Sequence, residues 1–171
     1  MQHGVWSDAH SFYCERFGGS QGGERASRLA MLPLLRDIVQ RLLAAAHGKG
    51  SERLILFSGH DTVVAPLLAA LGGMRSPELC RWPPYASHIT FEVWSSSLAE
   101  RGPADALEVR VLFNGEAVTQ YLYGCEVGKA GAEGGFCPLS ALAETVRKLG
   151  VEFDSTCGEY PYASAQSGRG G

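Results

Sequence analysis

The sequence predicts an α/β fold, and two local patterns carry this prediction. Leu54–Ser58 is a short apolar run bounded by turn-forming residues, which is typical of a buried strand. Helical patterns precede and follow it, and this order favours a parallel sheet covered on both faces. Further along, Leu107–Phe113 alternates apolar and polar residues before Asn114-Gly115, and residues 118–122 run back, which predicts a two-residue β-hairpin.

Length and composition fit a single globular domain. The chain has 171 residues, of which 45% are hydrophobic and 19% charged. Its formal net charge of −3 gives no reason to expect a nucleic acid or a membrane surface as partner. No apolar run is long enough to span a bilayer, and the N-terminus has neither the basic nor the apolar region of a signal peptide.

The first part of the chain is expected to contain two helices. Residues 1–23 have no periodic pattern and are expected to be irregular. Leucines and other aliphatic residues recur at three- and four-residue spacing over 24–46, which predicts a helix that Pro33 kinks or begins. A second helix is predicted over 62–71, and Gly72-Gly73 ends it.

The remaining elements follow from turn residues and apolar spacing. Residues 77–87 are rich in proline and form a loop, and Ile89–Trp94 reads as a strand. A helix is predicted over 138–149, where Gly150 is expected to end it. Residues 158–171 have the composition of a disordered tail.

The candidate site is the pair His60-Asp61, at the junction of the predicted strand and the helix that follows. Ligands bind to open α/β sheets at this edge, and a helix start offers free N–H groups and a positive dipole to an anion. His60, as imidazolium, can hold an anionic oxygen. Asp61 can give a proton to a leaving oxygen. Both roles suit the cleavage of a phosphate ester.

Other interpretations of these residues stay open. A buried histidine followed by a helix-capping aspartate gives the same dipeptide. A His-Asp pair also occurs in helical hydrolases that bind two metals, but this would need further histidines as ligands, so no metal is expected. The other histidines, whose spacing is not that of metal ligands, are His3, His10, His47 and His88. Residues 83–88 also have two interpretations: they could line a pocket, or they could form a rigid loop that leads into the next strand.

The cysteines indicate disulfide bonds. Five cysteines occur, and none belongs to a C-x-x-C pair, which argues against a zinc ribbon or a thioredoxin motif. Disulfides are typical of an oxidising compartment, although the N-terminus does not read as a signal peptide. The odd number means that one cysteine lacks a partner within the chain.

A set of short motifs then points to a known family. In chain order they are Phe57-Ser58-Gly59-His60-Asp61-Thr62, Pro83-Pro84-Tyr85-Ala86-Ser87, Val111-Leu112-Phe113-Asn114-Gly115, Cys125, Cys137-Pro138-Leu139 and Cys157. With them, residues 24–157 resemble the C-terminal half of the histidine acid phosphatases, branch 2 of the histidine phosphatase superfamily. This family includes prostatic and lysosomal acid phosphatases and the phosphoxylose phosphatase group.

The resemblance implies the C-terminal part of a three-layer α/β fold and hydrolysis of phosphate monoesters through a phosphohistidine, with no metal or cofactor. By position, His60 would contact the phosphate of the ester and Asp61 would be the proton donor. It also implies a secretory, lysosomal or extracellular location. The cysteine pair that it implies is Cys125 with Cys137, while Cys157 matches a cysteine whose partner lies far upstream. Pairing of Cys14 with Cys80 is a separate guess, and the partners of these two cysteines stay open.

The sequence departs from the family in one essential respect. The nucleophile of the family lies in an Arg-His-Gly-x-Arg-x-Pro motif, which does not occur in these 171 residues. Without the nucleophilic histidine and the phosphate-binding arginines, covalent catalysis is not expected. The sequence therefore predicts an N-terminally truncated or inactive acid phosphatase-like chain, with exposed strand edges and low solubility. The alternative is a non-catalytic module that binds phosphorylated ligands or another protein.

Overall fold

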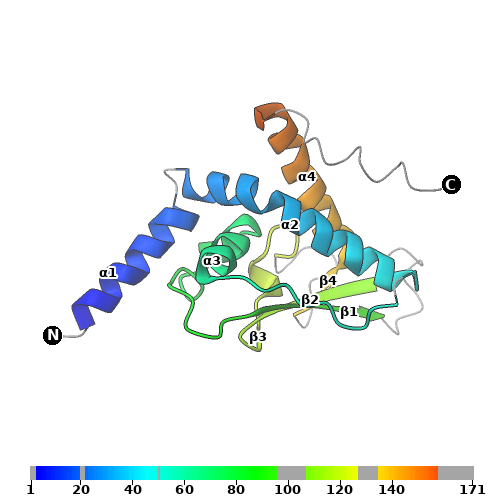
Figure 1. The fold of residues 1–171 in the computed structure, drawn as a ribbon, viewed down its shortest axis with the longest axis horizontal. Coiled ribbons are helices and arrows are strands. Elements are labelled where there is room, and N and C mark those ends of the chain that lie inside the picture. Colours follow the sequence, from blue (N-terminus) through cyan, green and yellow to red (C-terminus); the bar gives the residue numbers. More distant parts are fainter. Residues whose placement is uncertain (1–2, 20–21, 50, 96–106, 127–134, 158–171) are drawn as a thin grey trace.

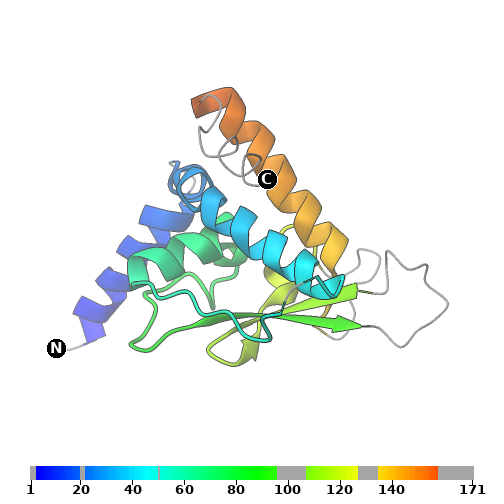
Figure 2. The same ribbon diagram turned by 45° about the vertical axis from the view of Figure 1, so that its right-hand side comes forward.

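The computed structural model describes residues 3–19, 22–49, 51–95, 107–126 and 135–157. Three of its helices, α2, α3 and α4, lie on one side of a four-stranded antiparallel sheet (Figures 1 and 2). This mixture of helices and sheet confirms the predicted α/β class. The expected parallel pairing is wrong for the strands of the described part, because all of them pair antiparallel.

The helices account for most of the core. They are α1 (His3–Tyr13), the short π-helix Cys14–Gly18, α2 (Gly23–Ala46), α3 (Asp61–Ala70) and α4 (Leu139–Cys157). Helices α2 and α3 begin and end close to the predicted residues. Their apolar faces pack with α4 in one hydrophobic cluster. In the described part of the chain, no helix has the length and apolar character needed to cross a membrane.

The N-terminal stretch is helical, so the expectation that residues 1–23 are irregular is wrong. The apolar residues of α1 do recur at helical spacing, a pattern that sequence reasoning missed: Val5, Trp6, Ala9, Phe12 and Tyr13. The last of them, Tyr13, is buried in the core. A disulfide between Cys14 and Cys80 fastens the end of this helix to the loop after α3, with the two Cα atoms 4.8 Å apart. Long-range contacts therefore stabilise the end of this helix.

Helix α4 also extends further than expected, because Gly150 does not end it. Gly150 is buried, and a Cβ atom at this position would lie 2.6 Å from the Arg36 side chain of α2. The glycine therefore allows close approach of a neighbouring helix instead of forming a helix stop.

The sheet is built around a long hairpin. Its strands are β1 (Ile89–Ser95), β2 (Leu107–Phe113), β3 (Glu116–Ala117) and β4 (Cys137–Pro138). Strand β2 lies between β1 on one edge and both β3 and β4 on the other. The predicted alternation of β2 is confirmed, since every second residue from Val109 onward is buried among the helices.

The hairpin turn is as predicted, but the return strand is shorter. Asn114 and Gly115 have φ of 52° and 88°, which is the conformation of a type I′ turn. After β3, Val118 N donates one further backbone hydrogen bond to Val111 O at 2.9 Å, and the buried hydroxyl of Thr119 then contacts the same β2 residue. Thr119 Oγ1 accepts a hydrogen bond from Val111 N at 2.8 Å and donates one to Val111 O at 3.2 Å. The predicted strand over 118–122 is therefore wrong, and a 3₁₀ turn takes its place.

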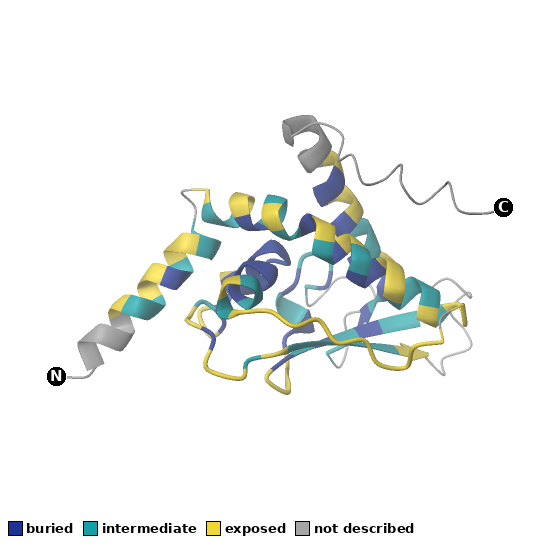
Figure 3. Cartoon of the chain, in the orientation of Figure 1, coloured by how far each residue is buried: buried dark blue, intermediate teal, exposed yellow. Residues whose placement is uncertain are grey.

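The largest departure concerns Leu54–Ser58, which is not a strand in the structure. Residues 51–60 connect α2 to α3 as an irregular segment that is exposed along its whole length (Figure 3). No other residue in the described ranges makes a backbone–backbone hydrogen bond with 51–59. The prediction of a buried strand is wrong for this chain because a strand is stabilised only by neighbours on its two edges and faces.

The exposed segment nevertheless keeps the alternation of a strand. Leu54 and Leu56 are 86% and 88% exposed, whereas the intervening Ile55 is 37% and Phe57 45% exposed. The ring of Phe57 lies beneath the guanidinium of Arg41 in α2, 5.9 Å away. One face of the segment is therefore half-covered by the chain itself, and the opposite face is bare.

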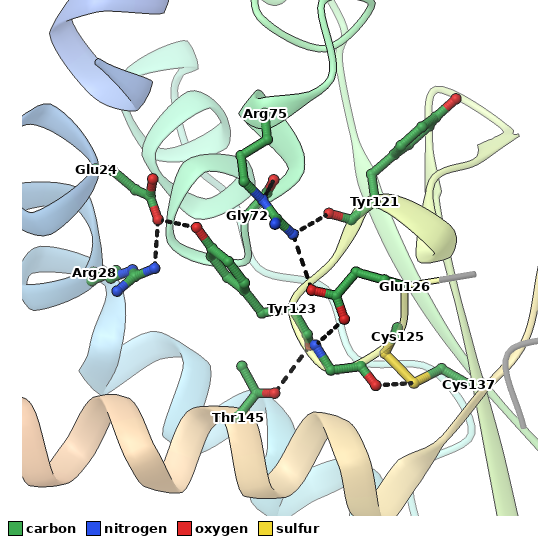
Figure 4. A network of polar contacts seen from close by, with 11 residues as sticks. Glu24, Arg28, Gly72, Arg75, Tyr121, Tyr123, Cys125, Glu126, Cys137 and Thr145 are labelled. Atoms are coloured by element: carbon green, nitrogen blue, oxygen red, sulfur yellow. Dashed lines mark hydrogen bonds and ion pairs between the residues drawn. A yellow bond between two sulfur atoms is a disulfide. The ribbon is translucent and has the colours of Figure 1, made fainter. Parts of the chain in front are cut away.

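A polar network joins the start of α2 to the turns after α3 and β3 (Figure 4). The Tyr123 hydroxyl donates a hydrogen bond to Glu24, which also pairs with Arg28. The Tyr123 ring lies between two guanidinium groups, with Arg28 4.7 Å and Arg75 4.0 Å from its centroid. Burial, followed by the hydrogen bond to Glu24, raises the pKa of Tyr123. This network therefore connects the start of α2 with both turns.

Candidate active site at the start of helix α3

The predicted pair lies at the junction between the exposed segment and α3. His60 is the last residue before the helix, and its carbonyl accepts hydrogen bonds from Val63 N at 2.9 Å and Val64 N at 3.0 Å. Asp61 is the first residue of the helix and is half-buried. The structure therefore brings the imidazole and the carboxylate to one helix start, as predicted, although the strand before them does not form.

The carboxylate of Asp61 is held at both oxygens. Its Oδ1 accepts a hydrogen bond from Thr62 N at 2.8 Å, and its Oδ2 accepts one from the Tyr13 hydroxyl at 2.9 Å. Together with the bonds to the His60 carbonyl, this occupies three N–H groups of the first turn. The expectation that these N–H groups are free for an anion is therefore wrong, and the positive end of the helix dipole remains.

His60 is exposed. Within the described part of the chain its imidazole has no hydrogen-bond partner, so the alternative of a buried histidine is excluded. An exposed imidazole at a helix start is accessible to an anionic group from solution.

Sequence reasoning missed Tyr13, which contacts Asp61, and Trp82, which packs against Tyr13. Tyr13 is only 6% exposed, and its ring stacks on Trp82 with centroids 4.3 Å apart and an interplanar angle of 25°. Burial, followed by the hydrogen bond to Asp61, raises the pKa of Tyr13. The Cys14–Cys80 disulfide lies one residue from Tyr13 and two from Trp82. A disulfide between Cys14 and Cys80 brings their sequence neighbours Tyr13 and Trp82 close together. The guess that these two cysteines pair could therefore have indicated that the two rings are in contact.

The proline-rich loop reads as a rigid connection. Tyr85 is fully exposed, and His88 N donates a hydrogen bond to Asn114 Oδ1 at 2.9 Å. Asn114 Nδ2 in turn donates to Ser87 Oγ at 3.2 Å. These bonds fasten the loop to the hairpin turn, while the Trp82 side chain at its beginning reaches the Tyr13 ring.

The predicted presence of disulfide bonds is confirmed. In addition to the N-terminal pair, Cys125 and Cys137 are bonded, with Cα atoms 5.4 Å apart. The side chain of Cys157 and residues 127–134 and 158–171 lie outside the described residues. Over the described ranges, no group of three histidine, cysteine, aspartate or glutamate side chains is placed to hold a metal ion.

Comparison with known proteins gives the family. The family model of the histidine phosphatase superfamily (branch 2) matches residues 6–114. This chain belongs to branch 2 of the histidine phosphatase superfamily. The match begins before residue 24 and ends before residue 157, so it includes α1 and the Cys14 region as well as the His60-Asp61 pair.

Individual proteins are similar over most of this chain. Counting factor 60 of Dictyostelium discoideum is 34% identical over 123 residues, which are 72% of this chain and 25% of the relative. For 2-phosphoxylose phosphatase 1 of Xenopus tropicalis the identity is 34% over 120 residues, covering 70% and 22% of the two chains. The human protein of that name is 30% identical over 122 residues, covering 71% and 24%. The chain thus spans about a quarter of the length of these relatives, and no solved structure matches it.

Proposed function

We propose that this histidine phosphatase chain supplies the proton-donor side of a phosphomonoesterase site. His60 would contact the phosphate of the ester, and Asp61 would protonate the leaving oxygen. The observation that carries this proposal is the exposed His60 beside the doubly hydrogen-bonded Asp61 at the start of α3. A general acid needs a fixed carboxyl group within reach of the leaving oxygen, and this placement is consistent with that role.

The nucleophile would come from a polypeptide segment that carries the Arg-His-Gly-x-Arg-x-Pro motif, because that motif is absent from the 171 residues. The bare face of Leu54–Phe57 supports this proposal. Its alternating exposure is that of a strand without neighbours, and it leads directly into the His60-Asp61 pair. A segment that paired with this strand would lie at the edge where both side chains are found.

The experiment is release of phosphate from an aryl phosphate at mildly acidic pH. The purified chain is assayed alone and after mixing with a family segment that carries the nucleophile motif. We expect no turnover by the chain alone and turnover by the mixture, which Asp61→Ala and His60→Ala reduce. Equal turnover by Asp61→Ala and wild-type mixtures would contradict the assigned role of Asp61.

A second candidate function is non-catalytic binding of phosphorylated ligands. The exposed imidazole of His60 and the absence of the nucleophile motif favour it. The protein is titrated with inorganic phosphate while the NMR signal of the His60 ring is monitored. This experiment distinguishes the binding function from the catalytic function. The binding function is favoured if His60→Ala abolishes phosphate binding and if the wild-type chain stays inactive after the nucleophile segment is added.

A further inference from the structure

Tyr13 is buried, lies far from Asp61 in the sequence and still hydrogen-bonds to it. From this contact we infer that Tyr13 is a positioning residue for Asp61, which rests on the proposed function of that carboxyl group. The Tyr13 hydroxyl is 2.9 Å from Asp61 Oδ2. Thr62 N is 2.8 Å from the other carboxylate oxygen, Oδ1, so the carboxylate is held at both ends.

The position of Tyr13 is fixed independently of Asp61. Its ring stacks on Trp82 and meets Phe17 edge-on, with centroids 5.3 Å apart. The disulfide of the neighbouring Cys14 fixes the backbone at this point. A side chain held on three sides loses little further freedom when it forms a hydrogen bond, so its hydroxyl can orient the Asp61 carboxylate.

The hydrogen bond matters most when Asp61 is charged. In the proposed reaction the O–H bond of protonated Asp61 breaks and an O–H bond to the leaving oxygen forms. The P–O bond breaks, its electron pair stays on the leaving oxygen, and the phosphoryl group passes to the nucleophilic histidine of the added segment. Asp61 is left as a carboxylate, and a hydrogen bond from Tyr13 to a charged oxygen is stronger than one to a neutral oxygen. Tyr13 therefore stabilises the charge that develops as the proton leaves.

The first test needs no turnover, because it follows ionisation of the Tyr13 phenol by ultraviolet absorbance and NMR. Loss of the neighbouring negative charge should make Tyr13 easier to ionise, so Asp61→Asn should lower the pKa of Tyr13 while its burial remains. A matched control is Glu24→Gln, which removes the corresponding partner of Tyr123. That variant should lower the pKa of Tyr123 and leave the titration of Tyr13 unchanged.

The second test is turnover in the mixture that contains the nucleophile segment. Tyr13→Phe keeps the stacked ring and removes the hydroxyl, so we expect kcat to fall on the order of tenfold with little change in KM. A Tyr13 titration that Asp61→Asn leaves unmoved would overturn the inference, and so would unchanged kcat in Tyr13→Phe. If the wild-type mixture shows no turnover, the proposed function fails, and the titration alone decides the coupling of Tyr13 to Asp61.

Discussion

Replacing Leu54 and Leu56 with lysine tests whether their face of the segment is vacant. Both side chains are almost fully exposed, at 86% and 88%, so they contribute little to the stability of the chain alone. Substitutions at such surface positions change the free energy of unfolding by about 0.5 kcal/mol or less. Full burial of a leucine side chain is worth roughly 1.5–3 kcal/mol, so a partner that covered both would gain about 3–6 kcal/mol, which the lysines would remove.

Urea denaturation measures the stability of the chain alone, light scattering measures its aggregation, and phosphate release measures formation of an active mixture. The doubly substituted chain should unfold at nearly the same urea concentration as the wild type, aggregate less and fail to form an active mixture. Val151→Lys is the matched control, because Val151 is 61% exposed on α4 and should affect none of the three readouts. A loss of more than about 1 kcal/mol of stability in the Leu54 and Leu56 variant would refute the reasoning, since both would then belong to the chain's own core.

Three further predictions concern the fold. Thr119→Val leaves the N–H group of Val111 in β2 without an acceptor, so it should lower the free energy of unfolding by about 1–3 kcal/mol, as measured by urea denaturation. Thr119→Ser keeps a hydroxyl and should lower it clearly less. Gly72→Ala should cost about 2–4 kcal/mol, because Gly72 has φ of 90° and a Cβ would lie 2.6 Å from the Tyr123 ring; a stability equal to the wild type would contradict this packing. Since the pKa values of Tyr13 and Tyr123 are raised in the folded state, the stability they contribute should be complete below pH 10.0, their ordinary pKa, and fall as the pH rises above it. Replacing both with phenylalanine should flatten that decline in a pH series of denaturation curves.

Elements with local causes could be predicted from the sequence. The hairpin turn follows from Asn114-Gly115, which favours positive φ at two successive residues, and the alternation of β2 follows from its one buried face. The His60-Asp61 junction was found because a helix start is a local event, which does not need the strand before it.

Elements that depend on long-range contacts could not be predicted from the sequence. The apolar run at Leu54–Ser58 has the composition of a buried strand, but a strand forms only where other strands pair with it. The contacts that hold the end of helix α1, Tyr13 with Asp61 and Cys14 with Cys80, join residues 48 and 66 positions apart. The role of Thr119 was hidden for the same reason, since it depends on which backbone groups lie opposite its hydroxyl.

The central claim is that Leu54–Phe57 is an unpaired segment with the alternation of a strand, which leads into the His60-Asp61 pair and can pair with a partner strand. Amide hydrogen exchange tests it most directly, with the chain measured alone and after addition of the nucleophile-bearing segment. We predict fast exchange over 54–59 in the chain alone, while β2 is protected, and protection of 54–59 once the segment is added. Slow exchange of 54–59 in the chain alone, or fast exchange in a mixture that hydrolyses phosphate esters, would contradict the claim.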